Sequence, residues 1–322
     1  MGFALPCGEN PTANGQPPVK LTASDGQAGD GFGEWVVMDG DLAVVGSPRA
    51  NSAFPDTGAA YVFRWNGAVW TQQQKLTNTD VSPSNPMTAL AGAARGNLIV
   101  VGSYNDDEAA PDAGGAYVFG FSTIQQQWYQ QQELTASDAR TGDEFGHSVA
   151  TDAEVIVVGA NNDDHDNSDP TEEKGSAYVY RFNGVIWEQE QKLTASDAGR
   201  GHQFGSSVAV DSGVIAVSAP NHNVATGAVY VFRFNGVSWI EEHRISASDA
   251  ATGQRFGTSL ALRGDILVVG APGDDCQPGI DCGAAYVFRL HDGAWTEEAK
   301  IQSSDLVPNV FSVVPLRRTA TW

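Results

Sequence analysis

Basic residues are scarce in this chain of 322 residues, which has 18 lysines and arginines against 39 aspartates and glutamates and a formal net charge of −21. No basic stripe is available to neutralise phosphates, so the composition argues against a nucleic-acid partner. No apolar run approaches the roughly 20 residues that cross a bilayer, so we expect no transmembrane segment. The start, MGFALPCGEN, lacks the basic and apolar regions of a secretory signal, although a gene fragment could have lost one.

Cysteine is also rare, with one residue near the start, Cys7, and two that share a later loop, Cys276 and Cys282. The spacer between the last two, QPGID, is short and flexible enough to bring their Cα atoms within the ~4.4–6.8 Å that a disulfide requires. Two free, solvated thiols are the alternative. We predict a Cys276–Cys282 disulfide, which implies an oxidising compartment.

Helical periodicity of useful length is missing, and a repeat takes its place. A marker related to LTASD starts at Leu21 and returns at intervals of 52 to 59 residues. The later copies start at Leu76, Leu134, Leu193, Ile245 and Ile301. Self-similarity at this period indicates a single repeat array, although the length alone would allow two ordinary domains.

Each unit contains four predicted strands. The first follows a Phe-Gly pair, as in FGHSVA from Phe145, and a tight turn leads to an apolar run such as Ile266–Gly270. A variable loop precedes an AYVF-like strand, and an Asn-Gly or Asp-Gly pair then marks a hairpin, because both central residues of a type I′ turn need positive φ. The fourth strand contains a tryptophan, which we expect to pack in the core at equivalent positions: Trp70, Trp128, Trp187, Trp239 and Trp295.

Four antiparallel strands per unit at this spacing are typical of propeller blades. We therefore predict an all-β fold, a β-propeller of four-stranded antiparallel blades over residues 19–316, with five complete repeats plus an incomplete sixth. The sixth has an outer strand from Ile301 and a weak inner strand around Phe311, and Pro315 then breaks the pattern. Residues 1–18 are expected to be a disordered tail and residues 317–322 a C-terminal tail.

The Phe-Gly pair before the first strand and the Gly-Ala-Pro variants after the second resemble FG-GAP repeats, from about Val19 to Lys300. That family builds the propeller heads of integrin α subunits and many bacterial surface proteins. The resemblance implies an extracellular or cell-surface binding or adhesion module, and it makes a fragment of a larger, seven-bladed ring plausible. Integrin-type repeats often bind calcium between the first two strands, but here that connection is a tight turn such as Arg263-Gly264-Asp265, so this calcium site does not carry over.

The long acidic loops after the second strands are expected to share one face of the propeller with the SDxxxGxxFG connections. The recurring aspartate of LTASD lies on this face, either as a ring of ligands or as an Asx turn, and we favour the turn. These residues are Asp25, Asp80, Asp138, Asp197, Asp249 and Asp305. Three loop histidines, His165, His202 and His222, lack the spacing of a zinc site.

One loop of the third unit, NNDDHDNSDPTEEK, is a candidate calcium site. It gathers Asp163, Asp164, Asp166 and Asp169 within seven positions. Calcium takes 6–8 oxygen ligands, and flexible acidic loops supply them. The loop lacks the glycine and the bidentate acid of a standard calcium loop, so a solvated acidic loop stays open as the alternative. A weaker second candidate lies in the fifth unit at Asp274, Asp275 and Asp281.

For function, the expected class is a non-catalytic binding module that recognises a protein or glycan through the acidic loop face. A polysaccharide lyase or hydrolase on a propeller fold is the first alternative, and it would need a central pocket with converging His, Tyr, Arg or paired carboxylates. A purely structural repeat domain is the second. No nucleophile elbow, phosphate loop or zinc signature occurs in the sequence.

Overall fold

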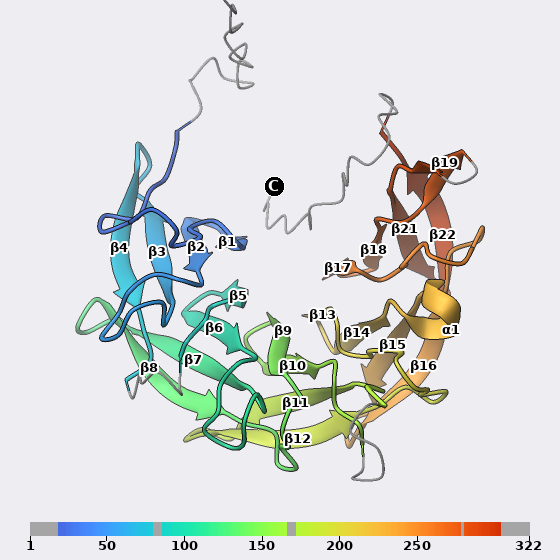
Figure 1. The fold of residues 1–322 in the computed structure, drawn as a ribbon, viewed down its shortest axis with the longest axis horizontal. Helices are drawn as coiled ribbons and strands as arrows, with labels where there is room; N and C mark the ends of the chain where they lie inside the picture. Colours follow the sequence, from blue (N-terminus) through green and yellow to red (C-terminus); the bar gives the residue numbers. More distant parts are fainter. Residues whose placement is uncertain (1–18, 80–85, 166–171, 278–279, 304–322) are drawn as a thin grey trace, which may run out of the picture.

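The computed structural model describes residues 19–79, 86–165, 172–277 and 280–303. Five four-stranded antiparallel sheets follow one another along the chain and are arranged around a common axis (Figure 1). Each sheet is a meander with its strands in sequence order, apart from an added hairpin in the fifth. This confirms the prediction of an all-β propeller with four-stranded blades. The predicted tails and most of the incomplete sixth repeat lie outside the described residues.

The strands occupy equivalent places in the five blades. The innermost strands are β1 (Val36–Asp39), β5 (Ala91–Arg95), β9 (Phe145–Thr151), β13 (Val208–Asp211) and β17 (Ser259–Arg263). The second strands are β2 (Leu42–Ser47), β6 (Leu98–Ser103), β10 (Val155–Ala160), β14 (Val214–Ala219) and β18 (Ile266–Ala271). The third strands are β3 (Ala59–Trp65), β7 (Gly115–Ser122), β11 (Ser176–Phe182), β15 (Ala228–Phe234) and β21 (Ala284–His291). The outermost strands are β4 (Trp70–Leu76), β8 (Gln127–Leu134), β12 (Trp187–Leu193), β16 (Trp239–Ile245) and β22 (Ala294–Ile301).

Two short elements interrupt this regularity. A hairpin of β19 (Asp275–Gln277) and β20 (Ile280–Asp281) lies in the loop of the fifth blade, and α1 (His222–Ala225) lies in that of the fourth. Asn223 and Val224 in α1 have positive φ, so this single turn is not a regular helix. Among the described residues, no helix is long and apolar enough to span a membrane.

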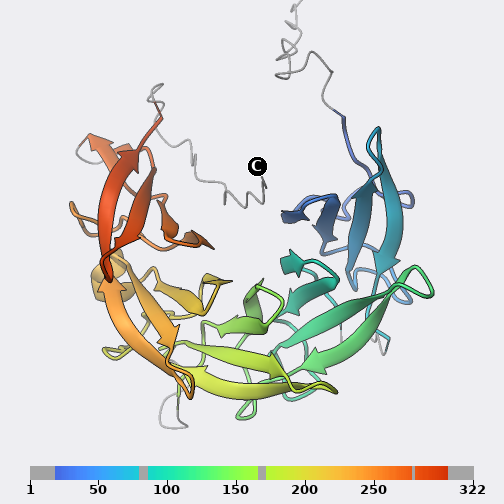
Figure 2. The ribbon, with the colours of Figure 1, turned by 180° about the vertical axis from the view of Figure 1, so that it is seen from behind.

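The second strands form the centre of the hydrophobic core. In the first four blades they are buried at every position. Neighbouring blades cover both faces in the second to fourth blades, and in the first blade Leu21, Ala23 and Phe32 of the same unit pack against the cluster that contains Ala43 and Val45. In the fifth blade, β18 is only partly buried at Ile266 and Val268. Figures 1 and 2 show the reason, since the ring is open between the fifth blade and the first.

The tryptophans of the outermost strands confirm the predicted repeat register. Each lies opposite the same position of the third strand, as Trp187 lies opposite Phe182. Trp128, Trp187 and Trp239 are buried, and their backbone N–H groups donate to a glutamine of the preceding blade at 2.7–2.8 Å. These tryptophans therefore link one blade to the next.

The Phe-Gly pair also acts at the contact between blades. The Phe145 ring packs edge-on against Tyr178 of its own blade, with ring centroids 5.4 Å apart. Gly146 has φ of 93° and lies so close to the second blade that an added Cβ would be 2.2 Å from the Gly115 carbonyl oxygen. The second unit has Ala89 in place of the glycine, and this residue keeps a positive φ of 47°. The glycine therefore serves both a strained φ and a close backbone approach.

The antiparallel meander sorts the connections onto two faces. The loops after the second strands and the connections between blades lie on one face, here called the loop face. The tight turns after the innermost strands and the Asn-Gly or Asp-Gly hairpins lie on the other, the turn face. This agrees with the arrangement expected from the sequence.

Candidate functional site

A cluster of polar side chains lies beneath the loop face in the blades and is best seen in the third. The Tyr178 hydroxyl donates to Asp138 at 2.8 Å and to Asp163 at 2.7 Å. Lys192, which lies opposite Tyr178 in the β11–β12 register, has its Nζ 2.7 Å from a carboxylate oxygen of each aspartate. We call this set of tyrosine, aspartates and opposing basic residue the blade box. It ties the loop, the connection between blades and the outermost strand to the third strand.

The same box recurs in other blades. In the first, the Tyr61 hydroxyl and Lys75 both contact Asp25, and in the fourth Tyr230 and Arg244 both contact Asp197. In the fifth, the Tyr286 hydroxyl donates to Asp249 at 2.8 Å and to Asp274 at 2.6 Å, and Lys300 pairs with both carboxylates. The LTASD carboxylates thus bind tyrosine and a basic residue, a role that the sequence analysis missed when it favoured an Asx turn. Asp80 and Asp305 lie outside the described residues.

Burial and ion pairing act in opposite directions on the box of the third blade. Burial opposes the ionisation of Asp163, but hydrogen bonds from Lys192 and Tyr178 outweigh it and hold the pKa of Asp163 below its ordinary value. Burial and the neighbouring Asp163 raise the pKa of Tyr178. Asp163 is therefore a charged, internally paired carboxylate.

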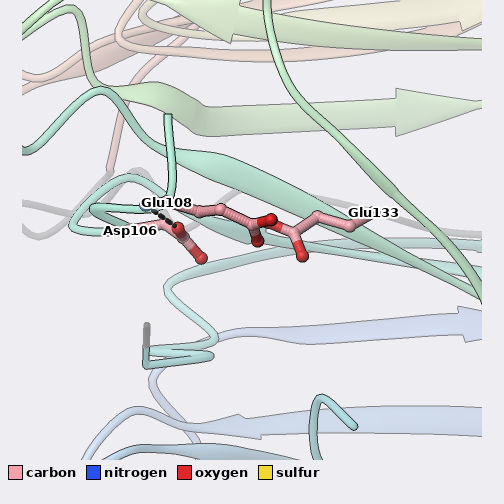
Figure 3. A group of neighbouring side chains, drawn as sticks. All are labelled: Asp106, Glu108 and Glu133. Carbon is pink, nitrogen blue, oxygen red and sulfur yellow. Dashed lines mark hydrogen bonds between the residues drawn. The ribbon is translucent and has the colours of Figure 1, made fainter. Parts of the chain in front are cut away.

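The second blade departs from this pattern. Glu133 lies opposite Tyr117, where the other four blades have a lysine or arginine. Asp106, which is 1% exposed, accepts hydrogen bonds from the Tyr117 hydroxyl and from the Glu108 N–H. Oxygen atoms of Asp106, Glu108 and Glu133 all lie within 4.8 Å of one another (Figure 3). Three carboxylates at this separation are the oxygen donors that hard divalent cations prefer, and the sequence analysis did not find this group.

A second group of carboxylates lies in the third blade. Asp143, Asp163 and Asp164 are all buried, and an oxygen of each lies within 4.8 Å of the others. Burial, followed by the charges of Asp163 and Asp164, raises the pKa of Asp143 to about 7. The predicted calcium ligands Asp163 and Asp164 are thus close together, but each also pairs with a basic side chain, Lys192 and Arg140 respectively. The other predicted ligands, Asp166 and Asp169, lie outside the described residues, so this calcium site stays a prediction.

Asp143 was missed in the sequence, although the repeat held a signal. Two residues before the phenylalanine of the Phe-Gly pair, the first, third and fifth units have Asp30, Asp143 and Gln254. Each accepts a backbone N–H from three residues earlier, at 2.7–2.8 Å. Gln254 also donates from Nε2 to Asp274 at 2.8 Å. The second and fourth units have Pro86 and His202 at this position, so alignment of the units would have marked it in three of the five units.

The fifth blade contains the second calcium candidate and the predicted disulfide. Asp274 is fully buried and engaged by Lys300, while Asp275 and Asp281 lie opposite one another in the β19–β20 hairpin. Cys282 is buried and disulfide-bonded. The side chain of Cys276 lies outside what the structure describes, so the identity of the partner cysteine stays a prediction.

Comparison with protein families finds one match in each of the five repeat units. The model of the FG-GAP repeat matches residues 18–63, 70–119, 128–180, 187–232 and 239–288. The chain belongs to the FG-GAP repeat family. No curated protein matches the sequence.

Solved structures agree on the FG-GAP chain's fold. Two similar ones carry the provisional name 6-phosphogluconolactonase and come from Bacteroides fragilis and Bacteroides uniformis. The first is 12% identical, with a TM-score of 0.53 over 82% of this chain and 69% of its own. The second is 11% identical, with a TM-score of 0.51 over 84% of this chain and 72% of its own. At these identities the likeness extends to the fold alone.

An axial cavity of about 350 Å³ lies where the innermost strands of the FG-GAP blades converge. Its wall is mostly apolar and includes Ala93, Val208 and Leu260, with Arg95 and Arg263 among its charged residues. Asp152 and Asp211 also line it, and each accepts a backbone N–H from the turn of the next blade. These carboxylates therefore serve the contact between blades.

The Arg263-Gly264-Asp265 sequence of this FG-GAP chain is a turn between β17 and β18. The Gly264 N–H donates to Asp211 at 2.7 Å, and Asp265 pairs with Arg289 at 3.0 Å. Both contacts are internal, as the interpretation of the tripeptide as turn chemistry expects.

Two of the three loop histidines lie together. The rings of His202 and His222 are 4.6 Å apart between centroids, and His222 Nε2 lies 3.1 Å from Asp197. Burial, followed by the neighbouring His222, lowers the pKa of His202. His165 instead contacts the Gly175 carbonyl oxygen of its own loop.

Proposed function

We propose that this FG-GAP propeller is a non-catalytic binding module that takes a protein ligand with a basic surface on its loop face. The supporting observation is Glu133, a carboxylate where the other blades have a basic side chain. Above it, Asp107, Glu108 and Asp112 are exposed in one loop. The second blade thus has a carboxylate at the position where the other four blades have a positive charge, and complementary charge steers and orients a protein partner.

The ligand class follows from the sign of this charge. Neutral glycans offer these carboxylates hydroxyl donors but no positive charge, and acidic glycans are repelled by the carboxylates and by the net charge of −21. A protein that presents lysine and arginine fits better. We place the module outside the cell or at its surface, because the disulfide bond of Cys282 needs an oxidising compartment.

A hydrolase is the second candidate, and one observation favours it. Asp143 has its pKa raised to about 7, a value suited to a general acid. However, Asp143 is only 4% exposed, and Gln254 makes the same backbone contact in the fifth blade. Because an amide replaces the carboxyl there, we assign this position to support of the loop.

The test compares two charge variants by surface plasmon resonance on a lysine-rich peptide and on neutral and sulfated oligosaccharides. Asp107→Asn with Glu108→Gln removes two charges from the loop face. Glu154→Gln with Asp292→Asn removes two exposed charges from the turn face. We expect the loop variant to weaken peptide binding about tenfold and the turn variant to change it less than twofold.

The outcomes separate the alternatives. Equal losses in both variants would show that binding follows net charge and would refute a loop-face site. Salt-insensitive binding of a neutral oligosaccharide would support a glycan ligand instead. Cleavage of any oligosaccharide during the assay, abolished by Asp143→Asn, would establish the hydrolase.

A further inference from the structure

The axial cavity has the size and the wall of a small-molecule site. All five innermost strands line it, together with part of β18. Four of the innermost strands contribute an alanine to the wall: Ala93, Ala150, Ala209 and Ala261. Because these side chains are short, they leave a space of about 350 Å³ on the axis. Mostly apolar hollows of this kind, with a few polar groups at one side, are the usual form of ligand pockets.

Two arginines lie at the turn-face end of this cavity. Arg95 is the last residue of β5, and Arg263 is the last residue of β17. Both also line a second hollow of about 450 Å³ on the turn face, whose wall includes Gly40 and Gly96 of the tight turns. The two hollows therefore meet at these arginines, and we call this place the turn-face mouth.

The aspartates around the turn-face mouth already have partners. Asp39 accepts a backbone N–H of the next blade at 2.6 Å, and Asp41 pairs with Arg64 at 2.9 Å. Asp152 and Asp211 each accept a backbone N–H in the same way as Asp39. These carboxylates are therefore engaged in contacts within and between the blades.

The two arginines of the mouth are less engaged. Within the part of the chain that the structure describes, the guanidinium group of Arg263 has no hydrogen bond or ion pair, and its side chain is exposed. Arg95 lies 3.9 Å from Asp39, which is too far for a hydrogen bond. A guanidinium group presents its N–H donors as a planar fork that matches a carboxylate. The mouth therefore offers donors for an anion beside an apolar space.

We propose that the axial cavity binds a small amphiphile with a single carboxylate group, such as a fatty acid of medium chain length. The apolar tail lies against wall residues such as Val208 and Leu260, and the carboxylate accepts hydrogen bonds from Arg263, with Arg95 as a second cation beside it. A peptide fits less well, because its backbone would bring polar groups against an apolar wall. The site lies on the axis and the turn face, so it does not depend on the protein ligand proposed for the loop face.

The first experiment varies the charge of the ligand. Isothermal titration calorimetry on the full chain compares decanoate with decanol, which has the same tail without a charge, and with decyltrimethylammonium, which has a positive one. We expect one decanoate per chain and decanol binding that is about tenfold weaker, since a charge-assisted hydrogen bond is lost. The ammonium compound should bind more weakly still. No saturable decanoate binding below its micelle concentration would overturn the proposal, and so would decanol binding as tight as that of decanoate.

The second experiment places the ligand with variants. Arg263→Gln should weaken decanoate binding about tenfold and leave decanol binding unchanged. Arg233→Gln is the matched control, because it removes the same charge from an ion pair with Glu242 on the outer strands of the fourth blade. Ala261→Phe fills the cavity and should abolish the binding of both probes, with circular dichroism as the check that the variant folds.

The variants also define what would overturn the site. Equal losses in Arg263→Gln and Arg233→Gln would show that binding follows net charge alone, and unchanged decanoate binding in Arg263→Gln would exclude the mouth. Decanoate binding that survives in a folded Ala261→Phe would place the ligand elsewhere. Because Arg263 is an exposed turn residue, its variant keeps the proposal testable even where Ala261→Phe does not fold.

Discussion

Replacing Asp143 by Asn should stabilise the protein at pH 8 more than at pH 5. Burial, followed by the charges of Asp163 and Asp164, raises the pKa of Asp143 to about 7, although the backbone N–H of Arg140 and the charge of Lys192 act to lower it. In the unfolded chain the carboxyl titrates near 3.9. Between about pH 4 and pH 7 the folded protein therefore binds a proton that the unfolded chain has lost. Stability from this group is fully present below about pH 4 and is lost as the pH rises through about 7.

The size of the effect follows from the two pKa values. A difference of about 3 units at 1.36 kcal/mol per unit sets an upper limit of about 4 kcal/mol above pH 7. At pH 5 the same reasoning gives about 1.5 kcal/mol. Because buried carboxylates relax partly when they ionise, we expect the gain from Asp143→Asn to be about 1–2 kcal/mol larger at pH 8 than at pH 5. For a chain of this size, that is a difference of about 2–6 °C in Tm.

The assay is thermal unfolding followed by circular dichroism at pH 5 and pH 8, with matched ionic strength. Glu154→Gln, an exposed carboxylate on the turn face, is the control and should shift Tm equally at both pH values. In the fifth blade, Gln254 already holds an amide at this position, so Asn is compatible with the local backbone contact. A gain for Asp143→Asn that is the same at pH 5 and pH 8 would refute the raised pKa.

Three other predictions concern the boxes and the fifth loop. Glu133→Lys should raise Tm by about 2–4 °C, because it removes one of three carboxylates that lie within 4.8 Å of one another and supplies a positive charge beside the other two; a lower Tm would contradict the box. Lys192→Met should lower the free energy of unfolding in urea by about 3 kcal/mol, because it leaves the buried Asp163 without its ion pair. Lys75→Met should lower it by less than about 1 kcal/mol, because the partner of Lys75, Asp25, is half exposed. Equal losses in the two variants would count against burial as the cause. Thiol titration of oxidised, digested protein should find Cys276 and Cys282 unreactive, and three alkylated cysteines would exclude the bridge.

Most of the fold was predictable because its determinants are local in sequence. Strand two is recognisable as an apolar run since both faces of the sheet are covered, and the Asn-Gly pairs mark hairpins through the φ values that they require. The tryptophan of strand four repeats in register, so unit boundaries follow from counting. The limit of this reasoning appears at Ile301, where the same apolar pattern ends on a half-exposed face.

The blade box was not predictable in the same way, because its members come from four segments, and in the third blade Asp138 and Lys192 are 54 residues apart. Tyr178 meets Asp138 and Asp163 only after the third strand has folded between the connection and the loop. An acidic loop by itself is compatible with a metal site or with solvated carboxylates, and the sequence analysis left both interpretations open for Asp163. The structure adds Lys192, whose side chain meets Asp163 only across the folded sheet.

The contact between tyrosine and carboxylate is the same in the blade boxes, whereas the charge of the opposing residue differs between blades. One part of the box therefore supports the fold, and another part can change the charge that a ligand meets. The tyrosine hydroxyl donates to a carboxylate in every described blade, whether the opposing residue is Lys192, Arg244 or Glu133. The base of each loop is therefore held by a contact that does not depend on the sign of the third member. A change from lysine to glutamate alters the field above one blade and leaves the backbone register of that blade intact. Negative charge can thus be concentrated in one sector of the loop face, and on this argument the second blade is where a ligand should bind.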